Sequence, residues 1–102
     1  MPTILVLFNL KPGASIADYE AWAKAKDIPT VNGLNSVSNF RVLKMGNLLG
    51  TETASPYQYA EIIEIPDMNA FFADLGSEAV QAGAKQFAEF ADNPQFIVAN
   101  DL

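Results

Sequence analysis

The chain has 102 residues, of which 50% are hydrophobic, and its six basic and twelve acidic residues give a formal net charge of −6. This length suits one domain, so we expect residues 1–102 to form a single unit. The acidic balance argues against nucleic acid and anionic membranes as partners, because few basic side chains are available to neutralise phosphate groups. The absence of cysteine and histidine excludes disulfides, thiolate metal sites and histidine-based proton transfer.

The sequence also lacks several common functional and targeting motifs. It contains no glycine-rich phosphate loop, no nucleophile elbow and no metal-binding cluster, so we expect neither a bound cofactor nor a metal. The apolar run at residues 4–10 is short and no basic segment precedes it, which argues against a secretory signal or a membrane span. We therefore expect a soluble, cytoplasmic protein whose acid/base chemistry depends on Asp, Glu, Tyr or Lys.

The first predicted element is a strand at residues 3–10. It is apolar on both faces except at Asn9, which is typical of a strand that is covered on both sides. A Pro-Gly pair ends it, and Ser15 is a good N-cap for a helix that runs to about Asp27. Because a proline disfavours helical backbone in the residue before it, we expect Pro29 to end this helix.

Two further strands are predicted at residues 36–45 and 57–65. In the first of them, Phe40 and Val42 lie on one face and Arg41 lies on the other. The loop that joins the two strands is polar except for the adjacent Leu48 and Leu49. Because exposed leucines are costly in water, we expect this pair to contact another subunit or to cover the mouth of a pocket.

The last part of the sequence predicts two helical segments and a final strand. One helix starts after Asp67, and a second starts after Ser77 and ends at Asn93-Pro94, before a strand at residues 95–99. The order β-α-β-β-α-β predicts an α+β, ferredoxin-like fold, with a four-stranded antiparallel sheet and its helices on one face. Since the first strand is apolar on the uncovered face too, we expect a homodimer joined through the sheet face.

An ordered set of residues in the first third of the chain is similar to a known pattern. It comprises the opening strand with Lys-Pro-Gly, a helix that holds Tyr19 and Trp22, and Asp27-Ile28-Pro29 leading into Gly33-Leu34. The set resembles the dimeric α/β-barrel superfamily, in particular the EthD-like and RedY-like small proteins of bacterial secondary metabolism.

The resemblance implies a dimer whose two sheets form a barrel, with a pocket between the sheet and the helices of each subunit. It also implies chemistry without a cofactor, since relatives include oxygenases and cyclases that act on polycyclic aromatic intermediates. RedY-like members are associated with indole and pyrrole pathways. Many EthD-like members carry a histidine at the position of Asp27, so this chain departs from their histidine-based chemistry.

Asp27 is the leading candidate for proton transfer. Helical spacing places it in register with Ile16, Tyr19 and Ala23, on the face that packs against the core. We expect it to line a cavity, and we expect partial burial near a helix C-terminus to raise its pKa. The alternative is a structural carboxylate that accepts hydrogen bonds from backbone N–H groups of the following loop.

The third strand supplies the other catalytic candidates, Glu61 and Tyr59. Glu61 is either a second acid/base group in the cavity or a cross-strand ion-pair partner of Arg41. We expect Arg41 to lie across from Asp27, where its charge would lower the pKa of Asp27. The candidate substrate-binding residues are Asn9, Tyr19, Trp22, Asn39, Arg41 and Tyr57.

Two classes of function fit these features. The first is a small cofactor-independent enzyme that acts on a hydrophobic aromatic intermediate, of indole, pyrrole or polyketide type, by carboxylate-assisted proton transfer. It would be a cyclase, an isomerase or an oxygenase. The second is a non-catalytic binding or carrier module for a small hydrophobic ligand, with the same pocket. A carboxylate with a perturbed pKa inside an open cleft favours the enzyme, whereas a carrier needs only an apolar pocket.

Overall fold

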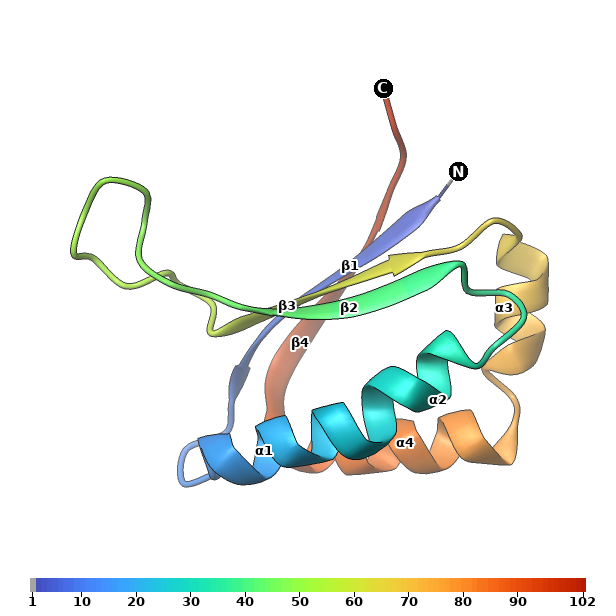
Figure 1. Cartoon of the computed structure of the whole chain (residues 1–102), viewed down its shortest axis with the longest axis horizontal. Helices are drawn as coiled ribbons and strands as arrows, with labels where there is room; N and C mark the ends of the chain where they lie inside the picture. The colour runs from blue at the N-terminus through green and yellow to red at the C-terminus, as the bar shows by residue number, and fades with distance from the viewer. Residues whose placement is uncertain (1) are drawn as a thin grey trace.

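The computed structural model describes residues 2–102 and shows a four-stranded antiparallel sheet with helices on one face (Figure 1). The strands are β1 (Thr3–Leu10), β2 (Asn39–Lys44), β3 (Tyr59–Glu64) and β4 (Ala91–Ala99), in the spatial order β2-β3-β1-β4. The helical segments are α1 (Ile16–Trp22), η1 (Ala23–Asp27), α2 (Ile28–Asn32), α3 (Met68–Asp74) and α4 (Glu78–Phe90). This order and topology confirm the predicted ferredoxin-like fold.

The core lies between the sheet and the helices. β1 is a central strand, and its alternation sends Val6 and Phe8 to the helix side, where both are fully buried. Tyr19 of α1 packs edge-on against Phe8, with ring centroids 5.7 Å apart, and the Tyr59 ring stacks on Phe8 at 5.6 Å. Edge-on and offset-stacked pairs are the favoured geometries of aromatic rings, so this cluster fixes α1 against β1 and β3.

The helix that begins after Ser15 does not end before Pro29, as the sequence predicted. It continues to Asn32, and the residues from Ala23 to Asp27 form a π-helical turn, in which the N–H of Ile28 donates to the carbonyl of Ala23. Such a turn inserts one extra residue, which accommodates the missing N–H and the bulky ring of proline within a continuous helix. The predicted end of the helix at Pro29 is therefore wrong, because the π-helical turn carries the helix past it.

The last strand begins earlier than predicted. β4 starts at Ala91 and includes Asn93 and Pro94, which the sequence had placed at the end of a helix. Its pairing with β1 shifts register between Leu7 and Asn9, and Asn93 adopts a positive φ of 48°. These features describe a bulge, which is where an edge strand tolerates proline.

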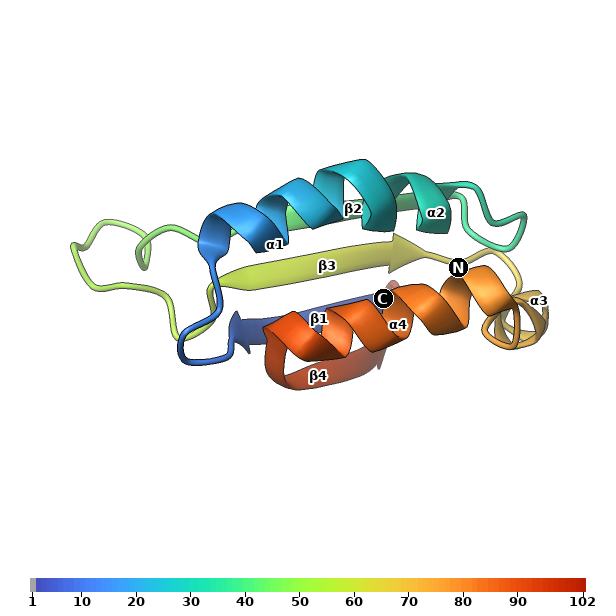
Figure 2. The same cartoon turned by 90° about the horizontal axis from the view of Figure 1, so that it is seen from below.

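The helices lie below the sheet in Figure 1 and in front of it in Figure 2, so the opposite face of the sheet is uncovered. Strand alternation places apolar side chains on it from three strands, namely Leu5 and Leu7 of β1, Ile62 of β3 and Ile97 of β4. Ile97 is 43% exposed. A monomer therefore presents an apolar sheet face to solvent, which is the feature from which the sequence predicted a dimer.

Candidate functional site

A cavity of about 570 Å³ lies between the helix side of the sheet and the helices. The sheet contributes Ile4, Glu61, Ile63, Phe96 and Val98 to its lining. The helices and the segment after α2 contribute Trp22, Lys26, Asp27, Thr30, Val31, Leu34, Phe71, Phe72, Leu75, Ala79, Val80, Ala82, Gly83, Ala84, Gln86 and Phe87. The lining is mainly apolar and aromatic, its polar members are Lys26, Asp27, Thr30, Glu61 and Gln86, and the volume of the cavity is typical of a small-molecule site.

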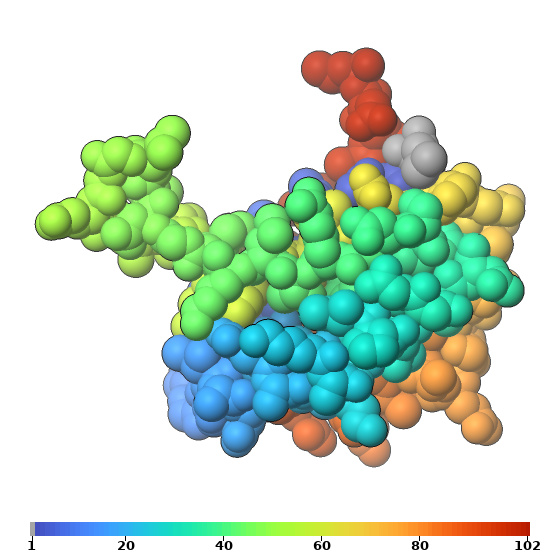
Figure 3. Space-filling model, viewed as in Figure 1, coloured from blue at the N-terminus to red at the C-terminus, as the bar shows by residue number. Residues whose placement is uncertain are grey.

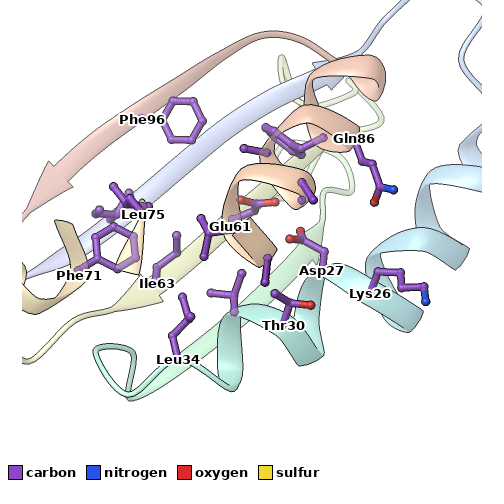
Figure 4. Close-up of a pocket in the computed structure, with 18 of the residues that line it drawn as sticks. Lys26, Asp27, Thr30, Leu34, Glu61, Ile63, Phe71, Leu75, Gln86 and Phe96 are labelled. Atoms are coloured by element: carbon purple, nitrogen blue, oxygen red, sulfur yellow. The ribbon is translucent and has the colours of Figure 1, made fainter. Parts of the chain in front are cut away.

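Two carboxylates face each other in this apolar cavity (Figure 4). Asp27 is the last residue of the π-helical turn, and Glu61 lies in the middle of β3. Glu61 is only 5% exposed, and its Oε2 atom is buried without a hydrogen-bond partner. A buried polar atom without a partner is costly, so the site retains unused capacity to bind a polar group of a ligand.

Burial raises the pKa of both carboxyl groups. It raises the pKa of Asp27 to about 6. Burial, followed by the negative charge of Asp27, raises the pKa of Glu61 to about 8. Near neutral pH the pair therefore holds about one proton, mostly on Glu61, because the second ionisation must place a charge beside an existing one in an apolar medium.

The position of Asp27 follows from the local structure of its helix. Its side chain makes no capping hydrogen bond to the backbone of α2. The structural alternative, a carboxylate held by backbone N–H groups, therefore does not describe it. π-helical turns occur frequently at functional sites because they redirect side chains that a regular helix would place elsewhere.

The position of Glu61 follows from strand register. Its cross-strand neighbours are Val6 on β1 and Val42 on β2. All three side chains point to the helix side, and neither neighbour can form an ion pair. Glu61 therefore has no countercharge across the strands, which leaves burial as the main influence on its pKa.

Arg41 does not lie where the sequence analysis placed it. It pairs with Ile62, one residue away from Glu61 in register, and therefore belongs to the uncovered face of the sheet. Both the expected position across from Asp27 and the alternative ion pair with Glu61 are wrong. Phe40 and Val42 alternate with Arg41 along the strand. Because the apolar face of this strand packs on the helices, these two residues indicated that Arg41 lies on the opposite face.

Three other candidate binding residues also lie outside the cavity. Asn9 bridges β1 to the start of β3, because its side chain donates to the carbonyl of Pro56 and accepts from the N–H of Gln58. Asn39 is exposed at the start of β2, on the same face as Arg41. Tyr57 is half-buried before β3 begins and does not line the cavity. The prediction that these three residues contact a ligand in this cavity is therefore wrong.

Tyr59 belongs to a second polar cluster, which it forms with Glu20 and Lys44 outside the cavity. Its hydroxyl donates to Glu20 Oε2 at 2.6 Å, and Lys44 Nζ lies 2.8 Å from the same oxygen. Burial and this hydrogen bond raise the pKa of Tyr59, whereas the bonds from Lys44 and Tyr59 lower the pKa of Glu20. Tyr59 is therefore held as a neutral donor and does not line the cavity.

Tyr19 lies between the two clusters. It is fully buried, and its hydroxyl has no hydrogen-bond partner. Burial, followed by the charges of Glu61 and Asp27, raises its pKa. Tyr19 packs against the candidate site but is not among the residues that line the cavity.

Trp22 lines the cavity wall, as a candidate for binding an aromatic ligand should. Its indole N–H donates to Gln86 Oε1 of α4 at 2.5 Å, which fixes the ring between the two helices. The sequence analysis missed Gln86 and the small residues of α4, including Gly83, which leave room for the cavity. The alanine and glycine residues of this helix were the sequence feature that could have indicated space for a cavity beside it.

No group of three His, Cys, Asp or Glu side chains within residues 2–102 is arranged to hold a metal ion. Across the same residues, no helix combines the length and the apolar character needed to cross a membrane.

Comparisons with solved structures place this chain among proteins of the same fold. HapK from Hahella chejuensis is 28% identical, with a TM-score of 0.80 over 100% of this chain and 93% of that one. A dimeric ferredoxin-like protein of unknown function from Thermobifida fusca is 16% identical, with a TM-score of 0.73 over 98% and 90% of the two chains.

SnoaB from Streptomyces nogalater, a cofactor-independent oxygenase, shares the fold at 13% identity, with a TM-score of 0.74 over 98% of this chain and 91% of that one. A search of curated proteins found no match. The family model described as "REDY-like protein HapK" matches residues 2–102. The chain therefore belongs to the RedY-like HapK family, which confirms the resemblance drawn from its first third.

Proposed function

We propose that this protein is a small cofactor-independent enzyme that moves protons on a hydrophobic aromatic substrate bound between the sheet and the helices. The observation that carries the proposal is the pair of facing carboxylates, Asp27 and Glu61, in a cavity whose lining is mainly apolar. An apolar pocket that only stores a ligand gains nothing from burying two carboxyl groups, each of which opposes burial in its charged form. Functional sites are where such costs are usually found.

The two pKa values assign different roles in proton transfer to the two carboxyl groups. Around pH 7, Asp27 is mostly ionised and acts as the base, while Glu61 keeps its proton and acts as the acid. Asp27 would take a proton from a ring C–H or N–H group, and Glu61 would deliver its proton to another atom of the same ring system. Return of the proton from Asp27 to Glu61 restores the starting state, so the step needs no oxidant or reductant.

The cavity suits an aromatic substrate of two or three fused or linked rings. Its volume of about 570 Å³ and its aromatic wall, with Trp22, Phe71, Phe87 and Phe96, favour flat apolar molecules. An indole or pyrrole N–H would meet the Asp27 carboxylate. Indole, pyrrole or polyketide-type intermediates of secondary metabolism are therefore the proposed class, with cyclisation or isomerisation as the proposed reaction.

An experiment with simple probes tests the proposal without the natural substrate. In deuterated buffer, the wild-type protein should accelerate exchange of ring hydrogens in indole or 2,2′-bipyrrole, as followed by mass spectrometry. Asp27→Asn keeps the size of the side chain and removes its ionisation, so it should lower the exchange rate by roughly 100-fold or more. The rate of the wild type should peak between pH 6 and 8, because base and acid are then correctly protonated.

The control for this experiment is Glu89→Gln, which removes one carboxylate from the exposed side of α4. Probe binding is measured separately by isothermal titration calorimetry, because indole fluoresces in the same range as Trp22, which lines the cavity. Binding of the probe should be retained in Asp27→Asn. Probe binding without accelerated exchange in the wild type would instead favour the carrier function, which the apolar lining also suits.

The proposal includes a homodimer joined through the uncovered sheet face. Its support is the apolar character of that face, with Leu5, Leu7, Ile62 and Ile97, and the dimeric state of the Thermobifida fusca protein of the same fold. Covering these side chains removes apolar area from water, which is the main driving force of such association. Light scattering at micromolar concentration should give the mass of two chains.

A further inference from the structure

The two carboxyl groups of the cavity lack a countercharge. In the part of the chain that the structure describes, the ion pair joins Lys44 to Glu20, outside the cavity. Lys26 is the basic residue among the described side chains that line the cavity. It is exposed, and its side chain points away from Asp27 and Glu61 (Figure 4). The negative charge inside the cavity is therefore not neutralised by a side chain of the described residues.

The same two groups have free capacity to accept hydrogen bonds. Glu61 Oε2 is buried without a partner, and the Asp27 side chain makes no capping bond to the helix backbone. An ionised carboxylate only accepts hydrogen bonds, so the site calls for a ligand that donates from N–H groups. A positively charged donor makes such bonds about twice as strong as a neutral donor does.

The walls of the cavity suit a flat cation. Side chains of the helix from α1 to α2 lie against those of β2 on one side of the molecule (Figure 3). The cavity opens instead at α3 and β4, where its lining residues Phe72, Phe96 and Val98 are 63%, 63% and 62% exposed. Trp22 lines the same cavity. Aromatic faces attract cations, and the indole ring does so most strongly, so the wall favours a delocalised positive charge.

We propose that the cavity selects flat organic cations, in which the charge is spread over a nitrogen heterocycle or an amidinium-like group, over neutral and anionic molecules of the same shape. The carboxyl groups of Asp27 and Glu61 accept hydrogen bonds from the N–H groups of the cation, and the aromatic wall packs on its rings. This inference rests on the proposed function, because it names the substrate class of that same site.

A cationic substrate also favours the proposed proton transfer. A neutral pyrrole-type ring is a very weak acid, whereas its protonated form loses a ring proton to a carboxylate much more easily. Asp27 takes a proton from one ring atom of the cation and becomes a neutral acid. Glu61 gives its proton to another ring atom and becomes a carboxylate. The product is an isomeric cation, and no oxidant or reductant is needed.

Three probes of one shape test the selection: the cation 2-naphthamidinium, the neutral 2-naphthamide and the anion 2-naphthoate. Isothermal titration calorimetry at pH 7 should show that the amidinium binds about tenfold more tightly than the amide, and that the naphthoate does not bind measurably. Physiological ionic strength screens surface charges beyond about 8 Å. Equal affinities for the amidinium and the amide, or no binding of the amidinium, overturn the inference.

Two variants locate the charge that is responsible. Asp27→Asn should bind the amidinium about tenfold more weakly than the wild type and should bind the amide normally, since the apolar wall is kept. Glu89→Gln removes the same charge from the exposed side of α4 and should keep the full preference for the cation. An equal loss in the two variants would show that the net charge of the protein attracts the cation, and the inference would fail.

A change of pH gives an independent measure. The titratable groups near Asp27 are Glu61 of β3 and Tyr19 of α1, while α4 contributes the uncharged Gln86 and the side chain of Lys26 points away. Because burial raises the pKa of Asp27 to about 6, the affinity for the amidinium should fall roughly tenfold from pH 7 to pH 5. The affinity for the amide should stay constant. An amidinium affinity that does not change over this interval contradicts the inference.

The outcomes separate this inference from the proposed function. Selective binding of the amidinium, without accelerated exchange of ring hydrogens in any probe, refutes the proposed enzyme and leaves a carrier that selects cations. Accelerated exchange without a preference for the amidinium refutes the selection of cations and leaves the proposed enzyme intact.

Discussion

The buried carboxyl of Glu61 makes the stability of this protein depend on pH, and Glu61→Gln should remove most of that dependence. Burial and the charge of Asp27 raise the pKa of Glu61 from its ordinary 4.5 to about 8 in the folded protein. Between these values the folded state keeps a proton that the unfolded state has released. The stabilising effect is therefore complete at low pH and is lost progressively as the pH rises from 4.5 towards 8.

The size of the effect follows from these pKa values. At 1.36 kcal/mol for each pKa unit, Glu61 should lower the free energy of unfolding by about 3 kcal/mol between pH 5.5 and 8.5. Asp27, whose pKa rises from 3.8 to about 6, adds about 1 kcal/mol over the same interval. An amide at position 61 does not ionise, so Glu61→Gln should keep only the smaller contribution and should exceed the wild type in stability at pH 8.5.

Urea denaturation at a fixed protein concentration measures this effect, with the midpoint and slope recorded at pH 5.5, 7.0 and 8.5 for each variant. Glu89→Gln again serves as control, because its exposed carboxylate should leave the pH dependence of the wild type unchanged. Equal pH profiles for the wild type and Glu61→Gln would show that Glu61 is not buried as a protonated acid. The division of roles between Asp27 and Glu61 would then fail as well.

Three further predictions concern the second cluster, the cavity wall and the sheet face. Tyr59→Phe removes the hydrogen bond to Glu20 and should cost about 0.5–1.5 kcal/mol in urea denaturation, with unchanged indole affinity because Tyr59 lies outside the cavity; weaker indole binding would contradict this placement. At Gly83 of α4 an added Cβ would meet nothing within 4 Å, so Gly83→Ala should stabilise the protein by about 0.5–1 kcal/mol, whereas Gly83→Phe should fill the cavity and abolish indole binding in isothermal titration calorimetry. Leu7→Lys places a charge on the uncovered sheet face and should yield a folded monomer by light scattering; a dimer of normal mass would argue against association through that face.

The sequence by itself determined the order of elements and the general place of the main site residue. The periodicity of strands and helices depends only on residues that are close in the sequence. The helix caps do too: Ser15 accepts a hydrogen bond from Asp18 N–H, and Asp67 accepts one from Asn69 N–H, as their positions indicated. The same local argument placed Asp27 in register with Tyr19 on the inner face of its helix. These features are properties of short segments, which is why a single sequence suffices to predict them.

Tertiary structure decided which groups surround Asp27 and Glu61. Strand register places Val42 rather than Arg41 beside Glu61, and a shift of one residue in register moves a side chain to the opposite face of the sheet. Register depends on pairing between segments that are distant in the chain, as does the partnership of Tyr59 with Glu20, 39 residues away. The π-helical turn carries the helix through Pro29 and leaves Asp27 at the cavity. The perturbed carboxyl pair thus arises only when the packing of α4 and the helix around Asp27 on the sheet removes water from both groups.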